Sequence, residues 1–497
     1  MDLTNSHAWK QFEGFRNRLK HKGFKAFLRK NLFGTRATIS TPFHASLPII
    51  PCDSTATGYP LKVIEEFLAT HVYPYYTNTH SNNLLGRYML KLVEESKNSI
   101  LNGVGGQEGI DRVIFTGSGS SGAVNHLVHL IAPRLAKGAV AIVSINEHYS
   151  NYLPWYENCA KVEVVGNDPT SGKIDVEDYV RLLDHWKAKG THEIIVSFSA
   201  CSNVTGVLQD VEYLAELCHR RGGLFFVDMA ASAPYVPISM HANDATLQYF
   251  DGLFISPHKF VGAQSSPGLL VVRESIACNR LPFLPAGGTV RHVCKHQPPI
   301  YSKDMETRES GGSLNVLGVI RCGLAFEIKD HFQDEMLQEE FDMTARMTEA
   351  LEKLAAEFPS FKLLTPTANP KRLPIFAFQI VPYHYNYIVA LLSDLFGIMT
   401  RGGVNCSGLL AESLLGLNQR SSARIRSAIT RGRGVPAPYG WVRLTLHSRL
   451  TSGDLTKIVG AIRYVVTHAK TYQDAYIYNR KSNLYCITSP TFPLRKE

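Results

Sequence analysis

The chain contains 497 residues, of which 44% are hydrophobic and 19% charged, and its formal net charge is +9. This length and apolar content suffice for two or more domains with buried cores. No apolar run approaches the roughly 18 residues needed to cross a bilayer, so we expect an ordered globular protein and exclude a membrane-spanning one.

The first 50 residues form a segment of their own, which begins with a basic stretch. Residues 1–30 hold eight basic and two acidic residues, with Phe12, Phe15, Leu19, Phe27 and Leu28 interleaved at near-helical spacing. This predicts a basic amphipathic helix, and packing on the folded protein is the simplest interpretation. A mitochondrial presequence is an alternative. A nucleic-acid or membrane-surface patch is another, but no nucleic-acid motif accompanies it, so we expect neither partner.

Between residues 110 and 275, short apolar runs alternate with longer amphipathic ones. The predicted strands cover residues 112–115, 139–144, 193–198, 224–227, 253–255 and 269–272, and the predicted helices cover residues 120–135, 176–189 and 211–221. This alternation predicts a large α/β domain over residues 51–325 with a mainly parallel sheet. Ligands of such sheets bind at the carboxyl ends of the strands.

The pattern changes after residue 325. A long polar helix is predicted over residues 326–357, followed by strands at 374–380 and 441–447 and helices at 387–396 and 454–470. These elements predict a smaller α+β domain over residues 326–478, with a peripheral tail at 479–497.

The nine cysteines are scattered and include no CxxC pair. They favour free thiols in a reducing compartment, so we expect a cytoplasmic protein, with the mitochondrion as the alternative. His292, Cys294 and His296 alternate along one stretch, but a structural zinc site needs a fourth ligand, and we expect no metal.

Two charged residues stand at the ends of buried strands. Lys259 follows one strand in the sequence SPHK, and Asp228 ends another strand 31 residues earlier. Lys259 alone is most simply a loop lysine. A carboxylate at the end of a buried strand needs a cationic partner, and the pyridinium nitrogen of pyridoxal 5′-phosphate (PLP) is such a partner.

Other strand ends carry polar residues that suit the same cofactor. The sequence FTGSGSSGAVN contains Gly119, Ser120 and Ser121 at a predicted helix N-terminus, which favours a phosphate; it matches neither a Walker A loop nor a dinucleotide fingerprint. His148 could lie on a pyridine ring, and Asn203 could donate to a phenolate oxygen. Taken singly, these are a serine-capped turn, a structural histidine and an Asx turn.

The order of these residues resembles the class V aminotransferase family of fold-type I PLP enzymes, most closely the cysteine desulfurase and selenocysteine lyase group. The resemblance covers roughly residues 50–470 and implies a seven-stranded type of sheet. It also implies that Lys259 is the Schiff-base lysine, Asp228 the pyridinium partner, His148 the stacking residue and Asn203 the contact to the phenolic oxygen. The implied phosphate ligands are Gly119, Ser120, Ser121, Ser256 and His258.

Three further stretches resemble parts of the same family. Ser313, in RESGGS, corresponds to a segment that reaches the partner's phosphate in family dimers, which implies a homodimer. Arg443, in GWVRLTL, corresponds to the arginine that grips the substrate carboxylate, and a guanidinium suits that role; the alternative is a surface arginine. Asn78 and His80, in YYTNTH, correspond to the entry segment near the substrate.

Cys406 lies in RGGVNCSG, where desulfurases place a loop cysteine that takes sulfur from the substrate. The nucleophile of such a reaction is the thiolate, and the alternative is an incidental free cysteine.

The sequence departs from the family at Ala231, where much of the group has a glutamine. One hydrogen bond to the cofactor is therefore missing unless Ser232 supplies it.

These features together predict a PLP-dependent cysteine desulfurase-like lyase. Lys259, Cys406 and His148 are its predicted catalytic residues, L-cysteine its substrate, and a sulfur-acceptor protein its partner. The alternatives are another class V enzyme (an aminotransferase, epimerase or selenocysteine lyase), a non-catalytic PLP-fold scaffold, and a nucleic-acid binder that uses residues 1–30.

Overall fold

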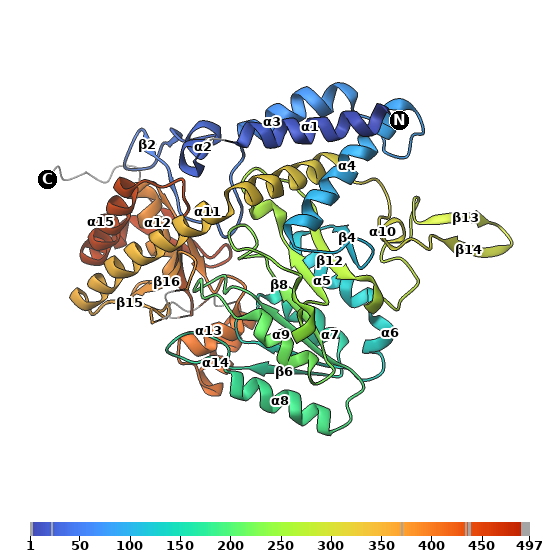
Figure 1. The fold of residues 1–497 in the computed structure, drawn as a ribbon. Coiled ribbons are helices and arrows are strands. Elements are labelled where there is room, and N and C mark those ends of the chain that lie inside the picture. The colour runs from blue at the N-terminus through green and yellow to red at the C-terminus, as the bar shows by residue number, and fades with distance from the viewer. Residues whose placement is uncertain (1–2, 21–22, 369–370, 433–434, 436–438, 489–497) are drawn as a thin grey trace.

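The protein is described from a computed structural model, which covers residues 3–20, 23–368, 371–432, 435 and 439–488. Two main sheets, five two-stranded sheets and the helices around them form the described part of the molecule (Figure 1). The larger sheet belongs to the first two thirds of the chain, and the smaller one to the last third.

The larger sheet has seven strands in the order β4-β12-β11-β8-β7-β5-β6. All neighbours pair in parallel except β12, which is antiparallel to both β4 and β11. The bounds are β4 Asp111–Thr116, β5 Val140–Ser144, β6 Lys161–Val165, β7 Ile194–Ser199, β8 Leu224–Asp228, β11 Gly252–Ile255 and β12 Gly268–Arg273. The predicted α/β fold with a mainly parallel sheet is confirmed, and β6 is a strand that the sequence analysis missed.

Successive side chains of the larger sheet enter two different cores, because strand residues alternate between the two faces. Ile114 packs in one core with helices α5 (Gly119–Leu130) and α6 (Ala132–Leu135), whereas Val113 and Phe115 pack in the other. Helices α4 (Leu84–Gly103), α8 (Val176–Ala188) and α9 (Val211–His219) contribute to that second core. Both faces are covered, which explains why the strands are nearly continuous apolar runs.

The smaller sheet has four antiparallel strands in the order β15-β16-β19-β18. Their bounds are β15 Phe361–Leu363, β16 Ile375–Ile380, β18 Arg401–Gly403 and β19 Trp441–Thr445. Helices α12 (Tyr385–Phe396) and α15 (Ser452–His468) share its hydrophobic core. Short helices α13 (Gly408–Leu414) and α14 (Gln419–Thr430) lie between β18 and β19.

Helix α11 runs from Val316 to Glu357 and so crosses the predicted domain boundary at residue 325. Its first half packs with α4, and its second half places Met343, Met347 and Leu351 in the core of the smaller sheet. The two halves meet at Phe332, whose backbone is not helical. One helix therefore joins the two units.

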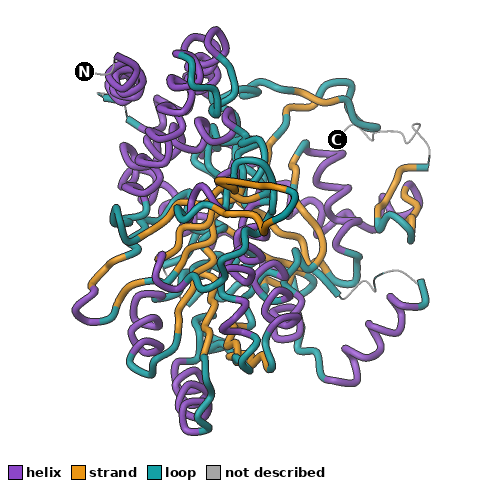
Figure 2. The backbone as a smooth tube through the Cα atoms, turned by 90° about the vertical axis from the view of Figure 1, so that its right-hand side faces the viewer, coloured by secondary structure: helices purple, strands orange, loops and turns teal. Residues whose placement is uncertain are grey.

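The basic N-terminal stretch forms helices α1 (Leu3–Leu19) and α2 (Phe24–Asn31). Phe12, Phe15 and Leu19 are buried in the core that α4 and α11 share, and Arg16 forms a salt bridge with Glu327 (2.7 Å). Figure 2 shows α1 at the outer edge of the molecule, next to the mark of the N-terminus. This arrangement agrees with a helix packed on the folded protein.

Two antiparallel hairpins extend the fold. Strands β13 (Val290–Cys294) and β14 (Gln297–Tyr301) form an exposed hairpin that projects from the molecule (Figure 1). Strands β20 (Tyr476–Asn479) and β21 (Leu484–Ile487) form the second, which packs on α12; residues 489–497 of the predicted tail lie outside the described residues. Within the described part of the chain, no helix is both long and apolar enough to cross a membrane.

Candidate active site

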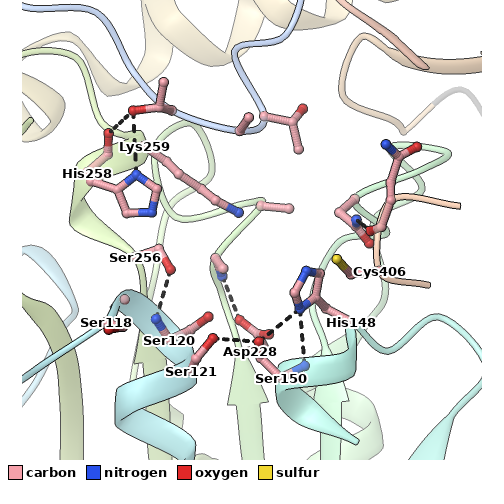
Figure 3. A pocket seen from close by; sticks show the side chains of 18 of the residues that line it. Ser118, Ser120, Ser121, His148, Ser150, Asp228, Ser256, His258, Lys259 and Cys406 are labelled. Carbon is pink, nitrogen blue, oxygen red and sulfur yellow. Dashed lines mark hydrogen bonds between the residues drawn. The ribbon is translucent and has the colours of Figure 1, made fainter. Parts of the chain in front are cut away.

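A cavity of about 660 Å³ opens at the carboxyl ends of the parallel strands. Its wall includes residues at or within a few positions of the carboxyl ends of five strands, β4, β5, β7, β8 and β11. Arg401, Cys406 and Arg443 from the smaller sheet and its loops also line it. Figure 3 shows Lys259 and Cys406 reaching this space from different sides. The cavity therefore lies where the two units of the chain meet.

Lys259 ends a short 3₁₀ turn, Pro257–Lys259, that follows β11. Burial lowers the pKa of Lys259 to about 8; nearby Asp228 counteracts this shift, and Arg443 adds to it. Asp228 is 4% exposed, its Oδ1 accepts a hydrogen bond from Ala230 N (2.9 Å), and burial raises its pKa. The pair therefore combines a readily deprotonated amine with a buried carboxylate, whose charged form a nearby cation would stabilise.

The predicted phosphate residues gather at the N-terminus of α5. Ser120 N donates to Ser256 Oγ (2.9 Å), and His258 lines the same part of the cavity. Gly119 has φ +54°, and a Cβ there would lie 2.8 Å from Ser256 Oγ, so this approach requires glycine. Ser121 Oγ lies 2.5 Å from Ser150 Oγ. Backbone amides at a helix N-terminus and several hydroxyl groups form a suitable anion seat.

His148 lines the cavity and is anchored by its own turn (Figure 3). Its Nδ1 accepts a hydrogen bond from Ser150 N (3.1 Å) and lies 3.0 Å from Ser150 Oγ. Burial, with help from Lys259, lowers the pKa of His148 to about 4. The imidazole is therefore neutral near pH 7 and fits an apolar, ring-stacking role.

Asn203 holds the loop that carries Cys406. Asn203 Nδ2 donates to Asn405 O (2.9 Å), Ser407 Oγ donates to Asn203 Oδ1 (2.8 Å), and Trp441 Nε1 donates to Asn405 Oδ1 (2.7 Å). Asn405 and Cys406 both have positive φ, +53° and +59°, a conformation that costs energy and persists only where the surroundings impose it. The sequence assigned Asn203 to a cofactor alone; the structure adds this role as a loop anchor.

The Arg443 guanidinium already has two partners within the chain, Asp53 and Asn203. Its Nη2 forms an ion pair with Asp53, its Nη1 donates to Asn203 O (3.1 Å), and its Nε is buried without a partner among the described residues. Arg401 lies directly opposite Arg443 in the β18–β19 pair and also lines the cavity. Asp53 is a functional candidate that the sequence analysis missed, since no local pattern links residues so far apart.

Three predicted residues do not line this cavity: Asn78, His80 and Ser313. His80 instead borders a second cavity of about 940 Å³, together with Gly288 and Gly312, the neighbour of Ser313. The structure thus places His80 of the entry segment and Gly312 of the predicted dimer segment at one cavity, which Lys259 does not line.

The position where much of the family has a glutamine is Ala231, and the structure shows which side chains lie near it at the cavity. Ala231 lines the wall, whereas Ser232, the predicted replacement, is buried, does not line the cavity and donates its hydroxyl to Met229 O (3.4 Å). Gln264 also lines the cavity, and both of its amide atoms are buried without a partner in the described structure.

Across the described part of the chain, no group of three or more histidine, cysteine or acidic side chains could hold a metal ion.

Comparison with known proteins places this geometry in a family. The Aminotransferase class-V family model matches residues 51–431. The chain belongs to the class V aminotransferase family. Members of this family use PLP, and the protein is a PLP-dependent enzyme.

Curated relatives of the class V chain include cysteine desulfurases. A probable cysteine desulfurase of Pyrococcus abyssi is 26% identical over 372 residues, covering 72% of this chain and 85% of the relative. The cysteine desulfurase IscS of Dictyoglomus turgidum is 24% identical over 438 residues, covering 86% and 98%. In the solved cysteine desulfurase of Thermococcus onnurineus, 95% of the chain aligns with 84% of this one at 22% identity and a TM-score of 0.69, which confirms the fold.

The residues of the cavity fit PLP, as the class V family requires. The α5 N-terminus offers the phosphate seat, Asp228 offers a buried carboxylate to a protonated ring nitrogen, and neutral His148 offers a ring face. The Gln264 amide has no hydrogen-bond partner among the described residues, and a bound cofactor could supply one.

Proposed function

We propose that the protein is a cysteine desulfurase-like lyase, which removes sulfur from L-cysteine and leaves alanine and a persulfide on Cys406. One observation carries the proposal: Cys406 lines the same cavity as Lys259, Asp228 and His148. The loop that presents this thiol is held in place on both sides of Cys406, because Asn203 bonds to Asn405 O and to the Ser407 hydroxyl.

PLP would be held by Asp228, His148, Asn203 and Lys259, with its phosphate at Gly119, Ser120, Ser121, Ser256 and His258. When bound, it supplies an electron sink for bond cleavage at the substrate. Asp228 would keep the ring nitrogen protonated, because its buried carboxylate is stabilised by a cation. Asn203 Nδ2 uses one hydrogen for Asn405 O and retains a second for the phenolic oxygen.

Lys259 would act as the proton carrier at the substrate Cα. An amine whose pKa lies at about 8 is partly neutral near pH 7, so it can accept a proton there and return it. Arg443, or Arg401 opposite it, would hold the substrate carboxylate. Since Arg443 is paired with Asp53, a carboxylate bound to Arg443 has to share or displace that partner.

Cys406, as a thiolate, would attack the substrate sulfur. The new S–S bond forms as the Cβ–S bond breaks, the electron pair stays with the carbon skeleton, and protons complete alanine. L-cysteine and the Cys406 thiol are thereby converted to alanine and the Cys406 persulfide, so no outside oxidant or reductant is needed. An acceptor protein would then remove the sulfur.

A homodimer is also part of the proposal. Asn78, His80 and Ser313 do not line the cavity of their own chain, and the exposed hairpin β13–β14 presents Val293 and Ile300, which are 61% and 54% exposed. A second copy would cover these side chains and bring the three predicted residues to the partner's cavity. Sedimentation should show a dimer that PLP stabilises; a monomer that retains PLP fully would contradict this.

We further propose a cytoplasmic location. All nine cysteines are unpaired, which suits a reducing compartment. The buried side chains of α1 belong to the folded core, which argues against a presequence that is cleaved.

A turnover assay tests the function directly. Purified protein loaded with PLP is given L-cysteine and a thiol reductant, and sulfide and alanine are measured together. We expect equal amounts of both from wild type and a loss of sulfide release in Cys406→Ser, with Cys294→Ser, a change at an exposed cysteine, as the matched control. Transamination products, or normal sulfide release by Cys406→Ser, would assign the protein to another class V reaction.

A further inference from the structure

Helix α14 is unusual among the helices because none of its side chains is buried. It lies in the segment between Cys406 and Arg443, beside α13 at the surface of the molecule (Figure 1). A 12-residue helix is marginally stable in water by itself, and most helices in proteins gain their stability from a packed face. Helix α14 has no buried side chain, and a capping box formed by Asn418 and Ser421 stabilises its N-terminus.

The outer surface of α14 is strongly basic. Arg420, Arg424, Arg426 and Arg431 are all exposed, and residues 413–432 contain no acidic residue. None of the four arginines forms an ion pair within the described residues. An exposed cluster of unpaired charges of one sign attracts a partner of opposite sign.

A groove lies beside α14, and Arg426 of the basic cluster is part of its wall. It has a volume of about 500 Å³ and is lined by Ile425, Ile429, Tyr439 and Glu412, among others. Ile429 is 47% exposed. The surface therefore combines a basic ridge with an apolar groove, which suits a folded or peptide partner with both acidic and apolar side chains.

The groove is connected to Cys406 through two tyrosines. Tyr149 N donates to Cys406 O (2.8 Å), and the Tyr149 ring packs so closely on Gly408, at the start of α13, that a Cβ there would lie 2.5 Å from its hydroxyl. Tyr439 packs against the small apolar cluster that contains Leu410 and Ala411 of the same helix α13. Tyr439 itself lines the groove.

We propose that α14 and this groove are the docking surface for an acidic, thiol-bearing protein that receives sulfur from Cys406. The inference rests on the proposed desulfurase function. The partner's thiolate would attack the outer sulfur of the Cys406 persulfide, the S–S bond would break, and Cys406 would leave as a thiolate, so the sulfur moves without net oxidation. The apolar groove favours a protein over a nucleic acid, whose phosphate backbone would use the arginines alone.

The test uses the full chain loaded with PLP and synthetic peptides as model acceptors. One peptide carries a single cysteine, one leucine and several glutamates; a second has lysines in place of the glutamates; dithiothreitol serves as an acceptor that needs no docking. The charge-reversal variant combines Arg420→Glu with the same change at Arg424, Arg426 and Arg431. A matched control reverses Lys10, Lys20, Arg29 and Lys30 on α1, α2 and the adjoining turn, giving an equal change in net charge far from Cys406.

For wild type, we expect faster sulfur transfer to the acidic peptide than to the basic one, with a preference that falls as salt is added. The α14 variant should lose about tenfold or more of its rate with the acidic peptide at low ionic strength. Its rate with dithiothreitol, and that of the control variant with either acceptor, should stay within about twofold of wild type. Equal losses in the α14 and control variants, or no loss in either, would overturn the docking assignment.

Further measurements separate this inference from the proposed function. Mass spectrometry of Cys406 after exposure to L-cysteine reports persulfide formation without any acceptor; if none forms, the proposed function fails. Fluorescence anisotropy of a serine version of the acidic peptide then still tests docking alone, and Ile429→Ser should weaken it. A single-stranded RNA that binds α14 more tightly, regardless of Ile429→Ser, would overturn the protein partner. If the fourfold variant does not fold, Arg424→Gln with Arg426→Gln should give a smaller loss in the same direction, and no loss would refute docking.

Discussion

The nine free cysteines should differ in alkylation rate by amounts that the structure sets. Burial raises the pKa of Cys159 and Cys201 to about 12, three units above the ordinary value of 9.0. Only the thiolate reacts, so each thiol should have roughly a thousandfold smaller reactive fraction than an ordinary one near neutral pH. Cys406 lines an open cavity and should react well ahead of both.

The assay replaces the two exposed cysteines, Cys294 and Cys486, by serine and follows iodoacetamide labelling by peptide mass spectrometry. In this background Cys406 should label first, and half-buried Cys278 provides a comparison outside the cavity. Brief prior exposure to L-cysteine should place one extra sulfur on Cys406 and on no other residue. Labelling of Cys406 as slow as that of Cys201 would refute the reasoning and, with it, the role given to the thiol.

Three further predictions concern other groups. Lys259→Ala should abolish covalent fixation of PLP by borohydride, and a reduced cofactor mapped to another lysine would refute the assignment. Asp228→Asn should leave the thermal unfolding midpoint unchanged, because the neutral amide that replaces the buried carboxylate still accepts a hydrogen bond from Ala230 N. Turnover should nevertheless fall about 100-fold or more. Near-normal turnover would show that Asp228 does not have the proposed role. Burial lowers the pKa of His447 from 6.5 to about 3. Between these two pH values the unfolded chain therefore binds more protons than the folded one. The free energy of unfolding should fall by about 2 kcal/mol as the pH drops from about 7 to about 5. His447→Asn should reduce this loss in urea unfolding, and an unchanged loss would show that other groups cause it.

Much of the candidate site follows from local sequence patterns and the resemblance that they support. Lys259, Asp228 and His148 stand at or after the ends of apolar runs, and the carboxyl ends of parallel strands meet at one edge of a sheet. The resemblance to class V aminotransferases then implied their roles. The structure brings all three to one cavity. Strand–helix alternation implies a parallel sheet, and such a sheet brings together residues that are more than a hundred positions apart in the chain.

Other contacts have no local signal. The Asp53–Arg443 ion pair joins residues 390 positions apart, and the bond from Asn203 to Asn405 spans 202 positions. Neither periodicity nor spacing encodes such pairs. The start of α11 was also missed, because Gly318 and Gly323 lower helix propensity; a Cβ at Gly323 would lie 2.6 Å from Ser96 of α4, so close helix packing requires glycine there.

The sequence by itself determined the α/β class, the strand ends and the residue types gathered there, because burial and backbone geometry act over a few neighbouring residues. Only the tertiary structure decided which partners those residues meet. It paired Arg443 with Asp53, bonded Asn203 to the Cys406 loop, gave Gln264 no partner among the described residues, and placed His80 outside the cavity that Lys259 lines. Those outcomes depend on how distant segments pack, and packing is a property of the whole fold.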